Sequence, residues 1–198
     1  SGICTHFAAI DPLRPEQAIV QHERFCAIRR VLESALQRKV MAHCSSSLPF
    51  LFKPEWDFDA VRTGILLYGY ETGHGLERVR TTPILQWKTR VLQCKTVPAG
   101  TTVGYGGAFI TSRTTDIATI SAGYADGYPR ALSNKGCVLI RGRRCPVAGR
   151  VSMNWISVDA GVSSGIHAGD EVVLIGRQGV ESLWADELAA LSGTISYE

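Results

Sequence analysis

The pattern of apolar residues changes near Thr81-Thr82-Pro83, and this change limits the folds that the chain can adopt. Before it, short apolar runs alternate with a long amphipathic stretch, which is typical of a parallel sheet or an α/β barrel. After it, β-type runs follow one another between turn-forming residues. We therefore expect part of an α/β barrel or sheet over residues 1–80 and a mostly β domain over residues 81–198.

The first segment should contain three strands and one long helix. Its strands are expected in the apolar runs at residues 3–7, 40–44 and 59–68. A helix is expected over residues 15–36, because apolar residues recur there at steps of three and four and Pro15 suits a first helical turn. Residues 45–47 should form a turn, and residues 48–52 a short helix or turn. Three strands are too few to close a barrel, so we expect this segment to belong to a larger domain.

The second segment should consist of short strands with a single late helix. The strands are expected in the β-type runs at residues 84–97, 102–105, 116–122, 136–140, 144–147, 152–158 and 171–175. A helix is expected over residues 182–191, with Ser182 as its N-cap and Asp186 and Glu187 in its first turn. The last residues, 195–198, have the composition of an interrupted strand.

Composition and charge exclude several classes of protein. The 198 residues carry a formal net charge of +3, too little to indicate a nucleic-acid surface. The apolar fraction of 45% suffices for a folded core, and the longest apolar run, residues 64–69, is far shorter than the ~20 residues of a membrane span. The first residues do not read as a secretory signal. The six cysteines include no Cys-x-x-Cys pair, so we expect free thiols in a reducing cytoplasm and no metal site.

Polar residues are expected where the strands of the first segment end, which is where α/β domains bind their ligands. His6 ends the first predicted strand, Ser47 follows the second, and Arg62, Gly64 and Ile65 lie in the third. The Ser47 hydroxyl and the amides of Gly64 and Ile65 can form a small phosphate cup. A structural histidine and a helix cap would explain His6 and Ser47 equally well.

Three motifs of the β domain combine glycine with aromatic or polar residues. They are GYGG at residues 104–107, GYADGY at residues 123–128 and GRVSMN at residues 149–154. Each can be a tight turn beside a packed side chain, but the glycines around Tyr105 should leave its phenol exposed. A phenol is a poor base unless nearby cations or donors lower its pKa, and His6, Arg62 or Arg150 would do so if the fold brings them close. The residues alone thus indicate a ligand site with a phosphate cup, an arginine and a reactive tyrosine.

Together these motifs identify a family. The chain resembles the alanine racemases, pyridoxal-phosphate enzymes built from an α/β barrel followed by a β domain. The resemblance rests on THFA at residues 5–8, HCSSS at 43–47, VRTGI at 61–65, VPAG at 97–100, VGYG at 103–106, GYADGYPR at 123–130, GRVSMN at 149–154, GDEV at 169–172 and TISYE at 194–198. It implies the C-terminal part of a TIM-type barrel, a racemase β domain, and an activity that supplies D-alanine for cell-wall precursors.

The resemblance also implies contacts to the cofactor, pyridoxal 5′-phosphate. Ser47, the amides of Gly64 and Ile65, and Tyr197 match the residues that hold its phosphate. Arg62 matches the residue that faces its pyridine nitrogen. Because a guanidinium keeps its proton at working pH, such a residue leaves that nitrogen unprotonated, which weakens the ring as an electron sink and limits side reactions.

Further roles concern the substrate. Tyr105 resembles the family's acid/base for one face of the substrate α-carbon, and His6 its hydrogen-bonded partner. Tyr124, Met153 and Asn154 match positions that line the substrate entrance and the carboxylate pocket. In this family the β domain reaches the active site of the other subunit, so the resemblance implies a homodimer with shared active sites, an amino acid substrate and neither nucleic acid nor metal.

The chain departs from the family pattern at points that bear on function. The family's cofactor lysine and its substrate-carboxylate arginine lie in a barrel half that this sequence does not contain, and Lys39 lies outside every motif. We therefore expect these 198 residues alone to be inactive. Ser46 replaces a common Asn.

Asn154 stands where most alanine racemases have Asp. Either it holds a turn after Met153 by side-chain hydrogen bonds, or it borders the substrate. In having Asn at this position, the chain resembles the serine-racemising branch of the family, which is associated with glycopeptide resistance. The racemase domain of that branch follows a membrane-embedded region, so the expected cytoplasmic location is compatible with a membrane anchor upstream of these residues. Alanine is the expected substrate and serine the second candidate. The alternatives are a truncated, non-catalytic racemase-like binding module and a barrel decarboxylase with the same cofactor.

Overall fold

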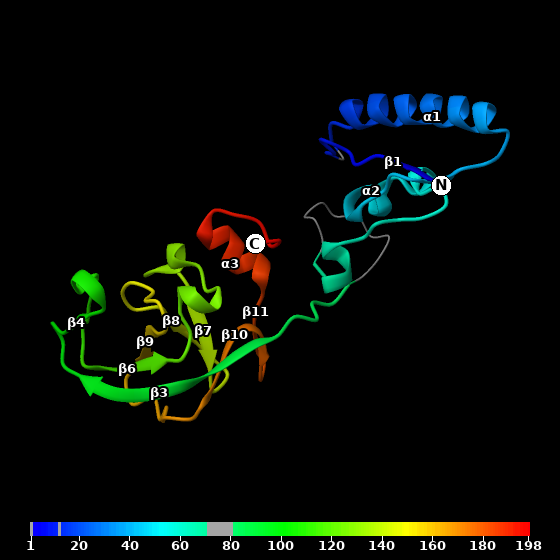
Figure 1. Cartoon of the computed structure of the whole chain (residues 1–198). Coiled ribbons are helices and arrows are strands. Elements are labelled where there is room, and N and C mark those ends of the chain that lie inside the picture. The colour runs from blue at the N-terminus through cyan, green and yellow to red at the C-terminus, as the bar shows by residue number, and fades with distance from the viewer. Residues whose placement is uncertain (1, 12, 71–80) are drawn as a thin grey trace. The chain divides into compact units, whose positions relative to one another are not determined.

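The computed structural model describes residues 2–11, 13–70 and 81–198, coloured in Figure 1. It divides into two compact units, Ser1–Pro83 and Ile84–Glu198. Residues 71–80, which the sequence assigns to the first domain, lie outside the described residues. Within the described ranges, no helix has both the length and the apolar character that crossing a membrane requires.

The first unit contains a strand–helix–strand element of the kind from which barrels are built. Strand β1 (Gly2–Cys4) pairs in parallel with β2 (Met41–His43), and helix α1 (Glu16–Leu36) connects them. The helix ends at Gln37, whose backbone is left-handed (φ 51°). The core between helix and strands is formed by buried apolar side chains: Phe7, Ala18, Phe25, Ala42, Cys44 and Trp56.

Short helices follow β2, and the third strand expected here is absent from the described residues. After β2 come α2 (Ser47–Phe52) and the 3₁₀ helices η1 (Pro54–Trp56) and η2 (Ile65–Tyr68). The prediction of a strand within residues 59–68 is wrong. Within the described residues, the strand-type pairing of this segment is limited to an isolated bridge between Arg62 and Ser46. At Gly64 the backbone leaves the extended region (ψ −90°), and its carbonyl oxygen accepts a hydrogen bond from the Leu67 N–H.

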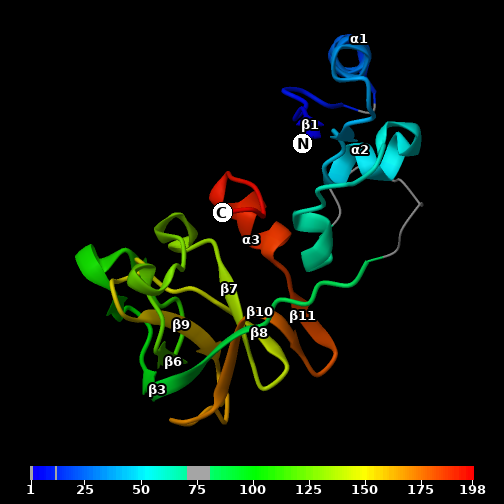
Figure 2. The same ribbon diagram turned by 45° about the vertical axis from the view of Figure 1, so that its right-hand side comes forward.

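The second unit is a seven-stranded antiparallel sheet, whose strands can be followed in Figure 2. The strand order is β8-β7-β10-β3-β6-β9, with β11 paired to β10. The strands are β3 (Trp87–Val97), β6 (Thr115–Ile120), β7 (Cys137–Ile140), β8 (Arg143–Pro146), β9 (Ile156–Gly161), β10 (Glu171–Gln178) and β11 (Glu181–Leu183). A separate hairpin joins β4 (Thr102–Val103) to β5 (Phe109–Ile110), and one helix, α3 (Ala185–Ser192), follows β11.

The core of this unit is apolar with one buried phenol. Alternate residues of β9 are buried, as expected for a strand with one face on a core. Tyr128, the last residue of the GYADGY motif, is fully buried, and burial raises the pKa of its phenol well above its usual range. A Cβ on Gly136 would lie 2.6 Å from the Tyr128 hydroxyl, so that position requires glycine. Tyr128 is therefore a core residue.

Four details of the second unit differ from the sequence-based expectation. Ser182 is no N-cap, because it pairs with Arg177 in the β10–β11 hairpin and the helix starts at Ala185. Residues 195–198 form a turn rather than a strand. The strand expected over residues 152–158 begins only at Ile156. The sequence also did not indicate β5 and β11, which are two and three residues long.

Candidate active site

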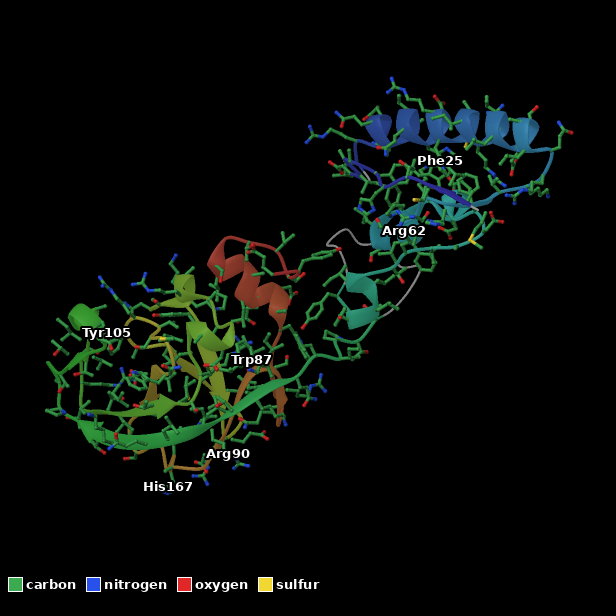
Figure 3. The ribbon with its side chains drawn as sticks, in the orientation of Figure 1. Phe25, Arg62, Trp87, Arg90, Tyr105 and His167 are labelled. Carbon is green, nitrogen blue, oxygen red and sulfur yellow. The ribbon has the colours of Figure 1, made fainter. Side chains whose placement is uncertain are left out.

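Arg62, labelled in Figure 3, is the centre of a hydrogen-bond network in the first unit. Its half-buried guanidinium donates to three backbone carbonyl oxygens: those of Thr5 at 2.7 Å, His43 at 3.2 Å and Cys44 at 3.3 Å. These carbonyls lie at or just beyond the ends of β1 and β2. A single side chain therefore ties together the carboxyl ends of both parallel strands, the edge at which α/β domains bind ligands.

Two histidines contact the same guanidinium. His43 Nδ1 lies 2.6 Å from Nη1 of Arg62, and His6 Nδ1 lies 3.3 Å from Nη2. Because the guanidinium keeps its protons, both Nδ1 atoms act as acceptors, and a neutral His6 carries its own proton on Nε2. His6 is exposed and lies two residues beyond β1 rather than within the strand.

His43 is the site residue that sequence reasoning missed. It lies in the HCSSS motif, but no role was derived for it. The same sequence feature that indicated His6, a polar side chain near the end of a predicted strand, also applies to His43. That signal does not say which neighbour the side chain will contact.

Ser47 and Gly64 lie together at the same end of the unit. The Oγ of Ser47, the buried first residue of α2, accepts hydrogen bonds from the N–H groups of Gly64 at 3.0 Å and Leu66 at 3.4 Å. The N–H of Ile65 has no acceptor within the described residues. A Cβ on Gly64 would meet nothing within 4 Å, so the space beside it is open. The structure brings together the hydroxyl and amides of the predicted phosphate cup, with the Gly64 amide bonded to the serine.

Tyr105 stands in the loop of the β4–β5 hairpin of the second unit. Its side chain is 65% exposed, and its neighbours Gly104 and Gly106 have φ values of 76° and 70°, which favour glycine. A Cβ on Gly106 would lie 3.7 Å from the guanidinium carbon of Arg150. The Arg150 side chain therefore lies over the tyrosine turn. His6 and Arg62 belong to the other unit, and their pairing with Tyr105 stays a prediction.

Two further predicted loops of the second unit are bonded to each other. The N–H of Tyr124 donates to Ser152 O at 3.0 Å, and that of Ala125 donates to Met153 O at 2.9 Å. A Cβ on Gly123 would lie 2.2 Å from Met153 O, so only glycine allows this approach. The structure thus brings Tyr124 and Met153 together, with their side chains 48% and 55% exposed.

Asn154 follows Met153 in an exposed bend. The bend is closed by the Ser152 N–H, which donates to Trp155 O at 3.1 Å. Within the described residues, the side-chain amide of Asn154 makes no hydrogen bond, so the turn-holding interpretation lacks the contact that it needs. Tyr197 is exposed in the turn after α3, and its phosphate contact stays a prediction.

Family models match both units. Residues 1–72 match the alanine racemase N-terminal domain, and residues 84–198 match the alanine racemase C-terminal domain. The chain belongs to the alanine racemase family. The resemblance drawn from the motifs is therefore confirmed. Among curated relatives, the alanine racemase of Syntrophobacter fumaroxidans is 43% identical over 198 residues and that of Symbiobacterium thermophilum 44% identical over 198 residues.

Solved structures show the same likeness. An alanine racemase from Bacillus anthracis with bound L-Ala-P superposes with a TM-score of 0.88 at 31% identity, covering 100% of this chain and 51% of that one. The Bartonella henselae alanine racemase with covalently bound pyridoxal phosphate gives 0.80 at 32% identity, covering 98% and 52%. The predicted fold class is thus confirmed. Both curated relatives are matched over 100% of this chain but only 52% of their own length, so the chain spans about half of them.

Proposed function

We propose that this chain is the C-terminal half of a pyridoxal-phosphate-dependent racemase that interconverts L- and D-alanine and supplies D-alanine for cell-wall precursors. The observation that carries the proposal is the network of Arg62 with His6 and His43 beside the Ser47–Gly64 pair, in a chain of the alanine racemase family. Residues 1–80 would belong to the barrel and residues 81–198 to the β domain.

The residues of the first unit fit the phosphate of the cofactor. The Ser47 hydroxyl accepts two amide hydrogen bonds and keeps its own proton to donate, while the Ile65 N–H has no other acceptor within the described residues. The open space beside Gly64 gives an anion room to approach these donors. Tyr197 would add a phenolic donor. When bound, pyridoxal phosphate supplies the electron sink that makes the substrate α-hydrogen acidic.

Arg62 would face the pyridine nitrogen of the cofactor. Three backbone carbonyls hold its guanidinium, so its orientation does not depend on the ligand. Because a guanidinium keeps its proton at working pH, Arg62 cannot give a proton to that nitrogen. The residue would thereby moderate the electron sink and favour return of the proton to the α-carbon over side reactions.

Tyr105 and His6 would handle the proton on one face of the substrate. Racemisation needs a base on each face of the α-carbon, and the phenolic oxygen of Tyr105 would be one of them. With Nδ1 of His6 accepting from Arg62, its Nε2–H is left as a donor that can stabilise a phenolate. The second base, the cofactor lysine, would come from the barrel half that this chain does not contain.

The proposal includes a homodimer that shares its active sites and a cytoplasmic location. The cysteines support a reducing compartment: all six are free thiols, and burial raises the pKa of Cys44 and Cys145 to about 11, which keeps these two protonated and unreactive. Among the described residues, no group of three or more His, Cys, Asp or Glu side chains is arranged to hold a metal ion.

Serine is the second candidate substrate, and Asn154 is the observation that favours it. Its side-chain amide, which makes no hydrogen bond to any described residue, carries two N–H donors where the common Asp has only acceptors and a negative charge. Such a donor could bond a substrate hydroxymethyl group. Tyr124, Met153 and Asn154 together would line the substrate entrance.

Chiral chromatography of the full-length protein with L-alanine tests the proposal. With pyridoxal phosphate bound, D-alanine should accumulate until the two enantiomers are equal, and removal of the cofactor should stop the conversion until it is added back. Cofactor binding without turnover of alanine or serine would identify a binding module instead. Release of CO₂ from the amino acid would identify a decarboxylase.

A further inference from the structure

Two loops that contain predicted substrate-side residues are both hydrogen-bonded to the side chain of Asn134. The tyrosine loop (residues 104–108) contains Tyr105, and the methionine loop (residues 149–154) contains Met153 and Asn154. Asn134 contacts both. Its Oδ1 accepts a hydrogen bond from the Gly149 N–H at 2.6 Å, and its Nδ2 donates to the Ala108 carbonyl oxygen at 2.8 Å.

We propose that Asn134 is a positioning residue whose single side-chain amide sets the spacing between the tyrosine loop and the methionine loop. The amide is suited to this because it offers a donor and an acceptor on one rigid plane. Neither Asp nor Ser can donate and accept across the same span. The catalytic consequence rests on the proposed function, whereas the link between the loops does not.

The segment around Asn134 supports this role. Ser133 Oγ accepts from the Val151 N–H at 3.0 Å, so two consecutive residues hold the methionine loop. Asn134 itself has a φ of 56°, a left-handed conformation that Asn adopts more readily than most residues. The backbones also approach closely, because a Cβ on Gly149 would lie 2.8 Å from Val103 O. The amide therefore links two loops that already lie in contact.

The position of the tyrosine loop is weakly fixed by the sheet, so a link such as the Asn134 amide matters for it. Among the residues that the structure describes, its strands β4 and β5 pair with each other and do not join the seven-stranded sheet. The far end of the hairpin is held by Thr111, whose Oγ1 donates to Pro98 O at 2.7 Å. Val103 belongs to a buried apolar cluster with Ile117 and Ala148, and such hydrophobic packing holds the hairpin without a directional preference. The Asn134 amide supplies a directional bond at the Tyr105 end.

Amide hydrogen exchange in the full-length protein tests the link without using catalysis. The variant Asn134→Gly removes the side chain and keeps the left-handed backbone free of strain. The Gly149 amide and the Gly107 amide, which donates to Gly104 O at 3.2 Å, should then exchange about tenfold faster, the scale of one lost hydrogen bond. In Asn134→Asp, which keeps the acceptor and loses the donor, only the Gly107 amide should exchange faster.

A matched control exists in the same unit. The Gln178 amide makes the same two kinds of bond elsewhere: it accepts from the Gly142 N–H at 2.9 Å and donates to Glu171 O at 3.1 Å. Gln178→Ala should accelerate exchange at Gly142 and leave both loops unchanged. If the Gly107 and Gly149 amides exchange at the same rates in Asn134→Gly as in the wild type, the proposed link is overturned.

Kinetics then test the positioning role. If Tyr105 is the base, Asn134→Gly should lower kcat for racemisation about tenfold or more, since small displacements of a catalytic group are costly. KM and the affinity for pyridoxal phosphate should stay within twofold of wild type, and Gln178→Ala should have normal kcat. Faster exchange with an unchanged kcat would overturn the positioning role. Faster exchange in a protein whose wild type has no racemase activity would leave the link standing and refute the proposed function.

Discussion

Replacing Gly64 by Ala should separate phosphate binding from folding. Gly64 has a φ of −108°, outside the left-handed region, and a Cβ there would touch nothing within 4 Å. The fold should therefore tolerate the methyl group, with the free energy of unfolding changing by less than about 1 kcal/mol. The same methyl group would occupy the open space next to the Gly64 and Ile65 amides, where we place the phosphate.

The size of the effect follows from the bonds that the phosphate would lose. A hydrogen bond to a charged group contributes about 1.5–3 kcal/mol net. A displaced phosphate would weaken one or two such bonds, a loss of about 2–4 kcal/mol. At 1.4 kcal/mol for each factor of ten, the Kd for pyridoxal phosphate should rise about 30- to 700-fold.

The assay compares two ligands on cofactor-depleted full-length protein. Pyridoxal lacks the phosphate, so the ratio of its Kd to that of pyridoxal phosphate isolates the phosphate contribution. Gly64→Ala should shrink this ratio strongly while its Tm stays near that of the wild type. Gly123→Ala is the control with the opposite outcome: its Cβ would lie 2.2 Å from Met153 O, so its Tm should fall while the ratio stays. An unchanged ratio in Gly64→Ala would refute the phosphate cup.

Three further predictions concern the β domain. Tyr105→Phe should lower racemisation by about 10²–10⁴-fold with the cofactor still bound, and near-normal turnover would assign the base elsewhere. Asn154→Asp should lower the ratio of kcat/KM for serine to that for alanine, and an equal ratio would leave Asn154 a neutral variant. Hydrogen bonds from Thr96 and Ser164 lower the pKa of the buried Asp116, so its charged form stabilises the fold at neutral pH, and this contribution is lost as the pH falls through that lowered pKa. Asp116→Asn should accordingly have a lower Tm than the wild type at pH 7, and this difference in Tm should shrink below about pH 4. An equal Tm at pH 7 would contradict a stabilising role for the charged Asp116 carboxylate.

Local periodicity predicted the elements that depend on it. Residues 15–36 carry apolar side chains at helical spacing, and α1 spans Glu16–Leu36. Ser182 carried an equally clear local signal for a helix N-cap, but its pairing with Arg177 in a hairpin prevailed. Residues 59–68 have the composition of a strand, but among the described residues they form a single β-bridge, between Arg62 and Ser46. Pairing with a strand residue outside the predicted helix decided the first case, and the lack of a longer partner strand among the described residues decided the second.

In the candidate site, too, the sequence predicted individual residues but not the contacts between them. The motifs identified Ser47, Arg62 and Gly64 one by one, yet the contacts that join them come from strands whose order the sequence does not state. His43 and Asn134 are the instructive omissions. Each is an ordinary polar residue near the end of an element, and only the folded backbone shows that one contacts Arg62 and the other links two loops.

The fate of the substrate α-hydrogen tests the central proposal most directly. Full-length protein with bound pyridoxal phosphate would be given pure L-alanine in D₂O and followed by proton NMR together with chiral chromatography. A racemase that moves a proton at Tyr105 predicts loss of the α-proton signal and formation of D-alanine deuterated at the α-carbon. Retention of the α-proton by cofactor-loaded protein, or formation of ethylamine, would contradict it.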